Sequence, residues 1–88
     1  MNNEQRIIGT WVEQNGHTWI FNANGTLRRI ADNMASEYKF AVTDTILATY
    51  FPGGRSTSTY DVSISSDGKT LILVASNNDR ISVWLTKK

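Results

Sequence analysis

The sequence predicts an all-β protein: an antiparallel up-and-down meander of about eight short strands, closed into a small lipocalin-like barrel. Three observations support this fold class. Apolar and polar residues alternate in several short segments, which is typical of half-buried strands. Turn-forming residues separate these segments, and no segment has the periodicity of a helix of useful length. Closure into a barrel accounts for so many short strands, because it leaves no sheet edge exposed.

The expected strands follow one another with short connections. Alternation is clear at His17–Phe21, where Trp19 and Phe21 share a face, and at Tyr60–Ile64. Consecutive strands with short connections pair antiparallel, which favours a meander. We place the strands at residues 6–14, 17–22, 26–31, 37–42, 45–51, 56–64, 69–76 and 80–87.

The predicted turns carry residues that tolerate a positive φ angle. Asn15-Gly16, Asn24-Gly25 and Asp67-Gly68 each place a glycine where a tight hairpin needs this conformation. The connection at Asp32–Ser36 is less regular, and a single helical turn would also fit there. The other turns are expected at Thr43–Asp44, Pro52–Arg55 and Asn77–Asp79.

Length and composition indicate one domain, residues 1–88, without any cysteine that could form a disulfide. Three Trp, three Tyr and three Phe residues supply an aromatic core. A net charge of +1 gives no general reason to expect a polyanion or an anionic membrane as partner. No stretch of about 18 apolar residues is present, so we expect no membrane span, and no signal peptide is recognisable. Abundant Ser, Thr and Asn favour a secreted or cell-surface location over a cytoplasmic one.

The triplet Gly9-Thr10-Trp11 stands in the first predicted strand. An aromatic strand, an Asn-Gly hairpin and further hairpins follow it, and the chain ends in a basic tail. Over nearly its whole length this pattern resembles the lipocalin-like, or calycin-like, small β-barrels of bacterial surface and lipid-anchored proteins. The specific part of the resemblance is the G-x-W triplet. The chain lacks the C-terminal helix and the T-D-Y motif of full-length lipocalins.

The resemblance implies a closure of one barrel end. In that superfamily the tryptophan of the triplet closes the barrel, and a basic side chain of the last strand packs across it. Carried over, Gly9 and Trp11 belong to this closure. Lys87 is the expected basic partner, because it shares a face with Val83 and Leu85. A cation over a tryptophan ring contributes about 0.5–1 kcal/mol at an exposed site.

A WD-repeat propeller blade is an alternative interpretation of the C-terminal third. Ser65–Leu71 followed by Asp79–Trp84 resembles such a blade, and the turn chemistry of Phe21–Gly25 returns at Ile64–Gly68, 43 residues later. A propeller needs about four to eight blades. This alternative therefore requires several chains in one ring.

The sequence shows no pattern for catalysis, so we expect no enzyme, no cofactor and no metal site. The chain has no cysteine, and its single histidine is His17. None of its serines stands in a G-x-S-x-G turn, and most of its carboxylates fall at turns, where they bind the backbone. His17 and Glu13 together supply fewer than the three or four ligands that zinc requires.

We expect instead a non-catalytic binding module for a small apolar or amphipathic ligand in the barrel. Aromatic walls with a few polar groups are typical of such sites. A barrel of about eight strands encloses space for side chains or for one small ligand, so a filled interior remains the alternative. The residues expected to line the site are Trp19, Phe21, Tyr38, Phe40, Tyr60 and Val62.

Two other function classes remain open. A packed structural domain of a surface or secreted protein would bind a protein partner through its rim loops, Pro52–Arg55 and Asp32–Ser36. A binder of single-stranded nucleic acid would combine basic and aromatic residues. Arg28, Arg29 and Lys39 lie near aromatic residues in the sequence, but the small net charge makes nucleic acid the less favoured partner.

Overall fold

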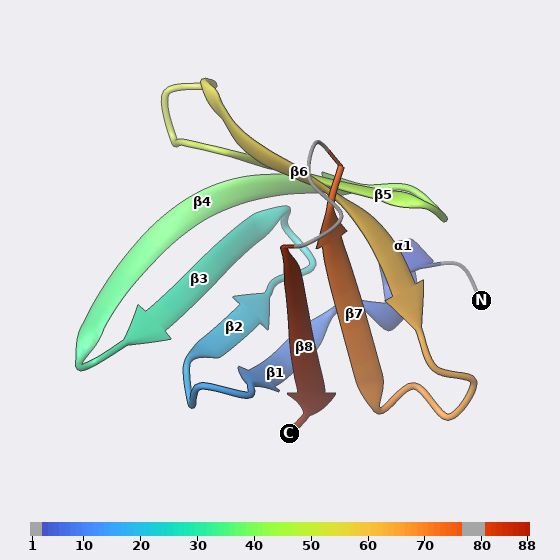
Figure 1. Cartoon of the computed structure of the whole chain (residues 1–88). Coiled ribbons are helices and arrows are strands. Elements are labelled where there is room, and N and C mark those ends of the chain that lie inside the picture. The colour runs from blue at the N-terminus through green and yellow to red at the C-terminus, as the bar shows by residue number, and fades with distance from the viewer. Residues whose placement is uncertain (1–2, 77–80) are drawn as a thin grey trace.

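The computed structural model describes residues 3–76 and 81–88. Its elements are α1 (Asn3–Arg6), β1 (Gly9–Glu13), β2 (Thr18–Phe21), β3 (Thr26–Ala31), β4 (Met34–Val42), β5 (Ile46–Tyr50), β6 (Ser56–Ile64), β7 (Thr70–Ala75) and β8 (Ser82–Lys87). Each strand pairs antiparallel with the next, and β1 also pairs with β8, so the sheet closes (Figure 1). The predicted all-β meander, closed into a small barrel, is confirmed. Because one chain closes the barrel alone, the propeller alternative is wrong.

The first strand begins later than predicted, at residue 9 instead of residue 6. Residues 3–6 form the single helical turn α1, and the following Ile7 is fully buried in the core. The Arg6 guanidinium donates a hydrogen bond to the Ser65 carbonyl, which ties this segment to the turn between β6 and β7. Burial of Ile7 removes apolar surface from water, so the segment turns inward instead of extending the sheet.

The expected connection Asp32–Ser36 is shorter than predicted. Asp32 and Asn33 alone form the turn, with φ angles of 51° and 69°, as a two-residue hairpin loop requires. Asp and Asn tolerate this left-handed conformation, and β4 therefore begins at Met34, not at residue 37. The expectation of a helical turn there is wrong. The predicted turn Asn77–Asp79 lies outside the described residues.

Alternation along the strands places every second side chain inside the barrel. Trp19 and Phe21 on β2, two residues apart, are both about 1% exposed. Burial of an aromatic side chain stabilises the fold by roughly 4–6 kcal/mol before conformational entropy is counted. The buried hydrophobic core consists of Ile7, Trp11, Trp19, Phe21, Leu27, Val42, Leu47, Val62, Leu71, Leu73 and Leu85.

The two ends of the barrel differ. The closed end contains α1 and the turns at residues 22–25, 43–45 and 65–69. The open end contains the turns at residues 14–17, 32–33 and 51–55. The β3–β4 and β5–β6 hairpins project from the barrel at the open end (Figure 1). Within the described residues, no helix has the length and apolar character needed to cross a membrane.

Candidate functional site

At the closed end, Gly9, Trp11 and Lys87 meet. Trp11 is fully buried, and its Nε1 donates a hydrogen bond of 2.8 Å to the Ile7 carbonyl. The Lys87 Nζ lies 4.6 Å from the Trp11 ring centroid and donates a 2.7 Å hydrogen bond to the Ile8 carbonyl. Burial lowers the pKa of the Lys87 ammonium. Gly9 has a φ angle of 133°, and a Cβ there would overlap the Lys87 Nζ, so the absence of a side chain lets the lysine cover the ring.

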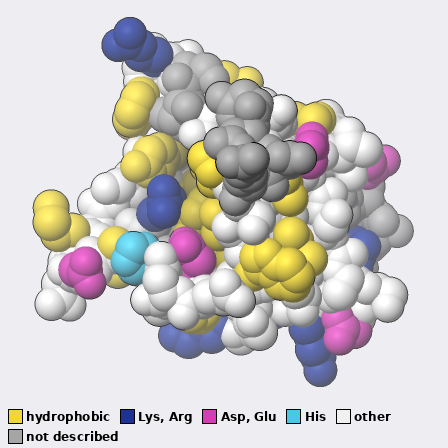
Figure 2. All heavy atoms as spheres, in the orientation of Figure 1, with side chains coloured by type: hydrophobic (Ala, Val, Ile, Leu, Met, Phe, Trp, Pro, Cys, Tyr) yellow, Lys and Arg dark blue, Asp and Glu magenta, His cyan; other side chains and the backbone are white. Residues whose placement is uncertain are grey.

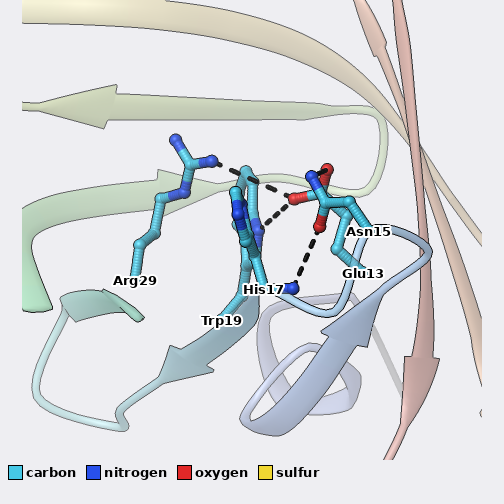
Figure 3. A network of polar contacts seen from close by, with 5 residues as sticks. All are labelled: Glu13, Asn15, His17, Trp19 and Arg29. Atoms are coloured by element: carbon cyan, nitrogen blue, oxygen red, sulfur yellow. Dashed lines mark hydrogen bonds and ion pairs between the residues drawn. The ribbon is translucent and has the colours of Figure 1, made fainter. Parts of the chain in front are cut away.

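At the open end, Trp19 takes part in a second contact of this kind. Trp19 lies opposite Trp11 in the β1–β2 register and opposite Arg29 in the β2–β3 register. The Arg29 guanidinium carbon is 4.3 Å from the Trp19 ring centroid. The indole Nε1 of Trp19 donates a hydrogen bond of 2.8 Å to Oε1 of Glu13 (Figure 3). Trp19 thus holds a cation on its face and an anion at its edge.

The Glu13 carboxylate is held by the β1–β2 hairpin. Its Oε2 accepts a 2.8 Å hydrogen bond from Nδ2 of Asn15, whose Oδ1 accepts one of 2.9 Å from the His17 backbone N–H (Figure 3). The Glu13 side chain is 16% exposed, and the nearest Arg29 nitrogen is 4.0 Å from its Oε1. Nδ1 of His17 is buried without a hydrogen-bond partner among the described residues. The carboxylate oxygens are therefore occupied by the hairpin and the indole, while Arg29 stands farther away.

A cavity of about 180 Å³ opens beside Trp19 at the open end. Tyr38 and Phe51 form part of its wall, with ring centroids 6.0 Å apart. Thr49 is 5% exposed, and its hydroxyl donates a 3.3 Å hydrogen bond to the Ser58 carbonyl. The lining residues are Trp19, Leu27, Arg29, Tyr38, Thr49, Phe51, Ser58 and Tyr60. Since an apolar cavity of about 150 Å³ holds benzene, this one has room for a single ring.

A second hollow, of about 350 Å³, adjoins the cavity along the β3–β4 hairpin. Arg29 and Tyr38 line both spaces. Figure 2 shows hydrophobic side chains on this face of the molecule, together with histidine, basic and acidic side chains. The open end therefore offers a cavity whose wall combines aromatic rings with the polar side chains of Arg29, Thr49 and Ser58.

The six residues expected to line a ligand site lie in three different places. Trp19, Tyr38 and Tyr60 line the cavity at the open end. Phe21 and Val62 belong to the buried core. Phe40 packs edge-on against Phe21, with ring centroids 5.1 Å apart, and borders a different hollow near the closed end. Alternation assigned these side chains to the inner face, but it carries no information about their height along the barrel axis.

Sequence reasoning did not assign Arg29 to this site. Leu27 is buried, and Arg29 is two residues farther along the same strand, so the period-two pattern was the signal that could have placed Arg29 inside. Arg29 was considered only together with Arg28 and Lys39, as a basic residue for nucleic-acid binding. Thr49 and Ser58 carry no sequence signal that distinguishes them from the other Thr and Ser residues of the strands.

The basic residues considered for nucleic-acid binding lie on two different faces. Arg28 and Lys39 are exposed, whereas Arg29 points to the interior. Trp19 and Phe21 are buried and present no ring to solvent. Stacking of nucleic-acid bases requires accessible aromatic faces beside basic side chains, so Trp19 and Phe21 could not serve as stacking surfaces in this arrangement.

Comparison with known proteins adds no family assignment. No family model, no curated protein and no solved structure matches the chain. The closed barrel of eight antiparallel strands is compatible with a lipocalin-like architecture. Its function must therefore be inferred from the geometry of the two ends.

Proposed function

We propose that the protein is a non-catalytic binding module for a small amphipathic ligand, whose apolar part enters the cavity at the open end. The observation that carries this proposal is a cavity with aromatic rings in its wall at the open end, opposite the end where Lys87 covers Trp11. The half-buried Tyr38 and Tyr60 supply ring surfaces next to the buried Trp19, and Arg29 supplies a charged group beside them. Apolar walls with a few placed polar groups are typical of ligand sites.

The size of the cavity limits the ligand. A volume of about 180 Å³ accepts one aromatic ring or a short alkyl chain. A long acyl chain would have to continue through the centre of the barrel, where Phe21, Leu71 and Leu73 are buried and packed. The proposed ligand is therefore a small molecule that leaves its polar end at the mouth.

We also infer that the chain is a lipocalin-like barrel of a bacterial surface or secreted protein. The Gly9–Trp11 triplet and the contact of Lys87 with the Trp11 ring support this inference. In this interpretation the closure by tryptophan and a basic side chain stabilises the end at which no ligand enters.

A packed interaction domain is the alternative to this proposal. Tyr38 and Tyr60 are half-buried and border the cavity, which supports a ligand site at the open end. Trp84 and Ile81 are about half exposed on the outside, at 46% and 51%.

A titration with benzyl alcohol tests the proposal, because this probe is neutral and carries one ring. The indole N–H signals of the three tryptophans in a ¹H–¹⁵N spectrum report on three places in the molecule. Trp19 borders the cavity, Trp11 is sealed and Trp84 is on the outer surface. We expect a saturable shift of the Trp19 signal with little change at the other two. Equal shifts at Trp19 and Trp84 would indicate non-specific contact and contradict the proposal.

Two serines of β6 offer a matched pair of variants. Ser58 lines the cavity, and Ser63 is exposed on the outer face of the same strand. Ser58→Phe should fill the cavity and abolish the Trp19 shift, and Ser63→Phe should leave it unchanged. If Ser58→Phe retains its fold and still binds benzyl alcohol as the unmodified protein does, the ligand site is elsewhere.

A further inference from the structure

We propose that the polar end of the ligand is an anion bound by Arg29, so that the site takes a small carboxylate with one ring or a short chain. This inference rests on the proposed function, since it assigns a chemical class to the ligand of the same cavity. The position of the guanidinium carries it. Arg29 borders both the cavity and the adjoining hollow, where the polar end of a ligand would lie.

The Arg29 side chain is oriented by the sheet and by Trp19. Its place two residues after the buried Leu27 directs it to the interior, and its strand register places it beside Trp19. The guanidinium lies over the indole ring, 4.3 Å from the centroid. A stacked guanidinium is planar and already restricted, so less rotational freedom is lost when it binds a carboxylate.

The donors of Arg29 are not consumed by Glu13. The distance of 4.0 Å between the Arg29 nitrogen and Glu13 Oε1 is an ion pair but exceeds hydrogen-bond length. The two oxygens of Glu13 already accept from Trp19 Nε1 and Asn15 Nδ2, each at 2.8 Å. A guanidinium has five N–H donors. Glu13 thus offsets part of the positive charge but leaves donors free for a ligand.

Arg29 favours an anionic over a cationic ligand. An ammonium group at the mouth would meet the like charge of Arg29, which already lies over the Trp19 ring. Glu13 is not among the residues that line the cavity, and its oxygens already accept hydrogen bonds. Asp32 lines the adjoining hollow together with Arg29 and would attract a cation there, so benzylamine is the probe that tests this alternative. A carboxylate, in contrast, can accept two parallel hydrogen bonds from a guanidinium. Its apolar part then lies against the aromatic walls.

The positive charge of Arg29 should increase the affinity for an anion only moderately. The Arg29 side chain is 36% exposed, so water and salt screen its field. We expect an anionic probe to bind about fivefold to tenfold more tightly than its neutral analogue at low ionic strength. The advantage should shrink in about 0.5–1 M salt, because screening shortens the reach of the charge.

Three probes that share one ring test the inference on the full chain: benzoate, benzyl alcohol and benzylamine. The Trp19 indole N–H signal reports binding, and the Trp11 and Trp84 signals are internal references. We expect benzoate to bind most tightly, benzyl alcohol more weakly and benzylamine most weakly. The salt dependence is measured with benzoate and benzyl alcohol in parallel, so that general salt effects on the apolar contact are subtracted.

Neighbouring arginines provide a matched pair of variants. Arg29→Gln removes the charge at the mouth, and Arg28→Gln removes the same charge from the outer face of β3, opposite Glu37. The advantage of benzoate over benzyl alcohol should disappear in Arg29→Gln and persist in Arg28→Gln. Arg29→Lys keeps the charge without the planar fork and should retain only part of the advantage. Binding of benzyl alcohol to each variant shows that the cavity is intact.

The possible outcomes separate this inference from the proposed function. If benzyl alcohol shifts Trp19 but benzoate binds no more tightly, or benzylamine binds best, the ligand is not an anion and the cavity proposal stands. If Arg29→Gln keeps the benzoate advantage, another group holds the anion and the assignment to Arg29 is wrong. If none of the three probes shifts Trp19, both proposals fail.

Discussion

The two ends of the barrel contain the same pair of groups, a cation over a tryptophan ring, in different surroundings. At the closed end, Lys87 lies 4.6 Å from the Trp11 centroid, and at the open end Arg29 lies 4.3 Å from the Trp19 centroid. The indole N–H of Trp11 donates to a backbone carbonyl, whereas that of Trp19 donates to the side chain of Glu13. Both ends thus pair an indole ring with a cation, but the group that accepts the indole hydrogen bond differs between them.

This difference predicts different roles for the two ends. At the closed end the segment before β1 buries Ile7 and supplies the Ile7 and Ile8 carbonyls that hold the tryptophan and the lysine. At the open end the partners are side chains, and a cavity remains beside the ring. Backbone acceptors cannot move without unfolding the segment, whereas side chains can rearrange around a ligand. The closed end should therefore dominate stability, and the open end should dominate binding.

Replacement of Trp11 by Ala should have the largest effect on stability. Removal of a fully buried tryptophan leaves a void in the core and frees the Ile7 carbonyl. We expect a loss of about 3–5 kcal/mol in the free energy of unfolding. Urea denaturation followed by tryptophan fluorescence measures it. A loss well below this range would show that the closed end contributes less than the comparison of the two ends requires.

Replacement of Gly9 by Ala tests the same end through the backbone. The φ angle of 133° is unfavourable for alanine, and the new Cβ would displace the Lys87 ammonium from its place over Trp11. We expect a loss of about 1–3 kcal/mol. Gly53→Ala is the control, because a Cβ there meets nothing within 4 Å, and its effect should stay below about 1 kcal/mol. Equal effects of the two substitutions would contradict the close packing at Gly9.

Two Trp-to-Phe substitutions sharpen the comparison directly. Trp11→Phe leaves the Ile7 carbonyl without its donor in a buried place, which should cost about 1–3 kcal/mol. Trp19→Phe removes a hydrogen-bond donor to Glu13. Because Glu13 keeps Asn15 as a partner and is partly exposed, this variant should lose less free energy of unfolding than Trp11→Phe. Paired thermal and urea unfolding measures the difference. A larger loss for Trp19→Phe would reverse the assigned roles of the two ends.

The ionisation of Lys87 should produce the smallest effect, visible only at high pH. Burial lowers its pKa in the folded state below the usual 10.5. At a pH between the lowered pKa of the folded state and 10.5, Lys87 is more protonated in the unfolded chain than in the folded protein. The contribution of this group to the free energy of unfolding therefore rises with pH in that range. We expect the stability of the unmodified protein to increase relative to Lys87→Met as the pH approaches 10.5. The difference is measured by urea denaturation at a series of pH values, and a fall in the same range would contradict the burial of Lys87.

Much of the fold could be predicted because the signals are local. Alternation assigned the inner faces of the strands, and Asn-Gly and Asp-Gly pairs marked hairpins whose glycines have positive φ angles. Two strand boundaries were predicted wrongly, the start of β4 and the start of β1. Asp32-Asn33 was a two-residue turn signal in its own right, and the segment before Gly9 was treated as strand, although burial of Ile7 makes it turn inward.

The sequence by itself determined the strands, their faces and the meander, because alternation and turn chemistry depend on neighbours in the chain. Only the tertiary structure decided which inward side chains fill the core and which surround the cavity. Phe21 and Val62 lie in the core, while Tyr38, Tyr60 and Arg29 meet at the open end. Height along the barrel axis is set by the stagger of paired strands. Closure of the barrel fixes this stagger, because it requires β1 and β8, from the two ends of the chain, to pair with each other.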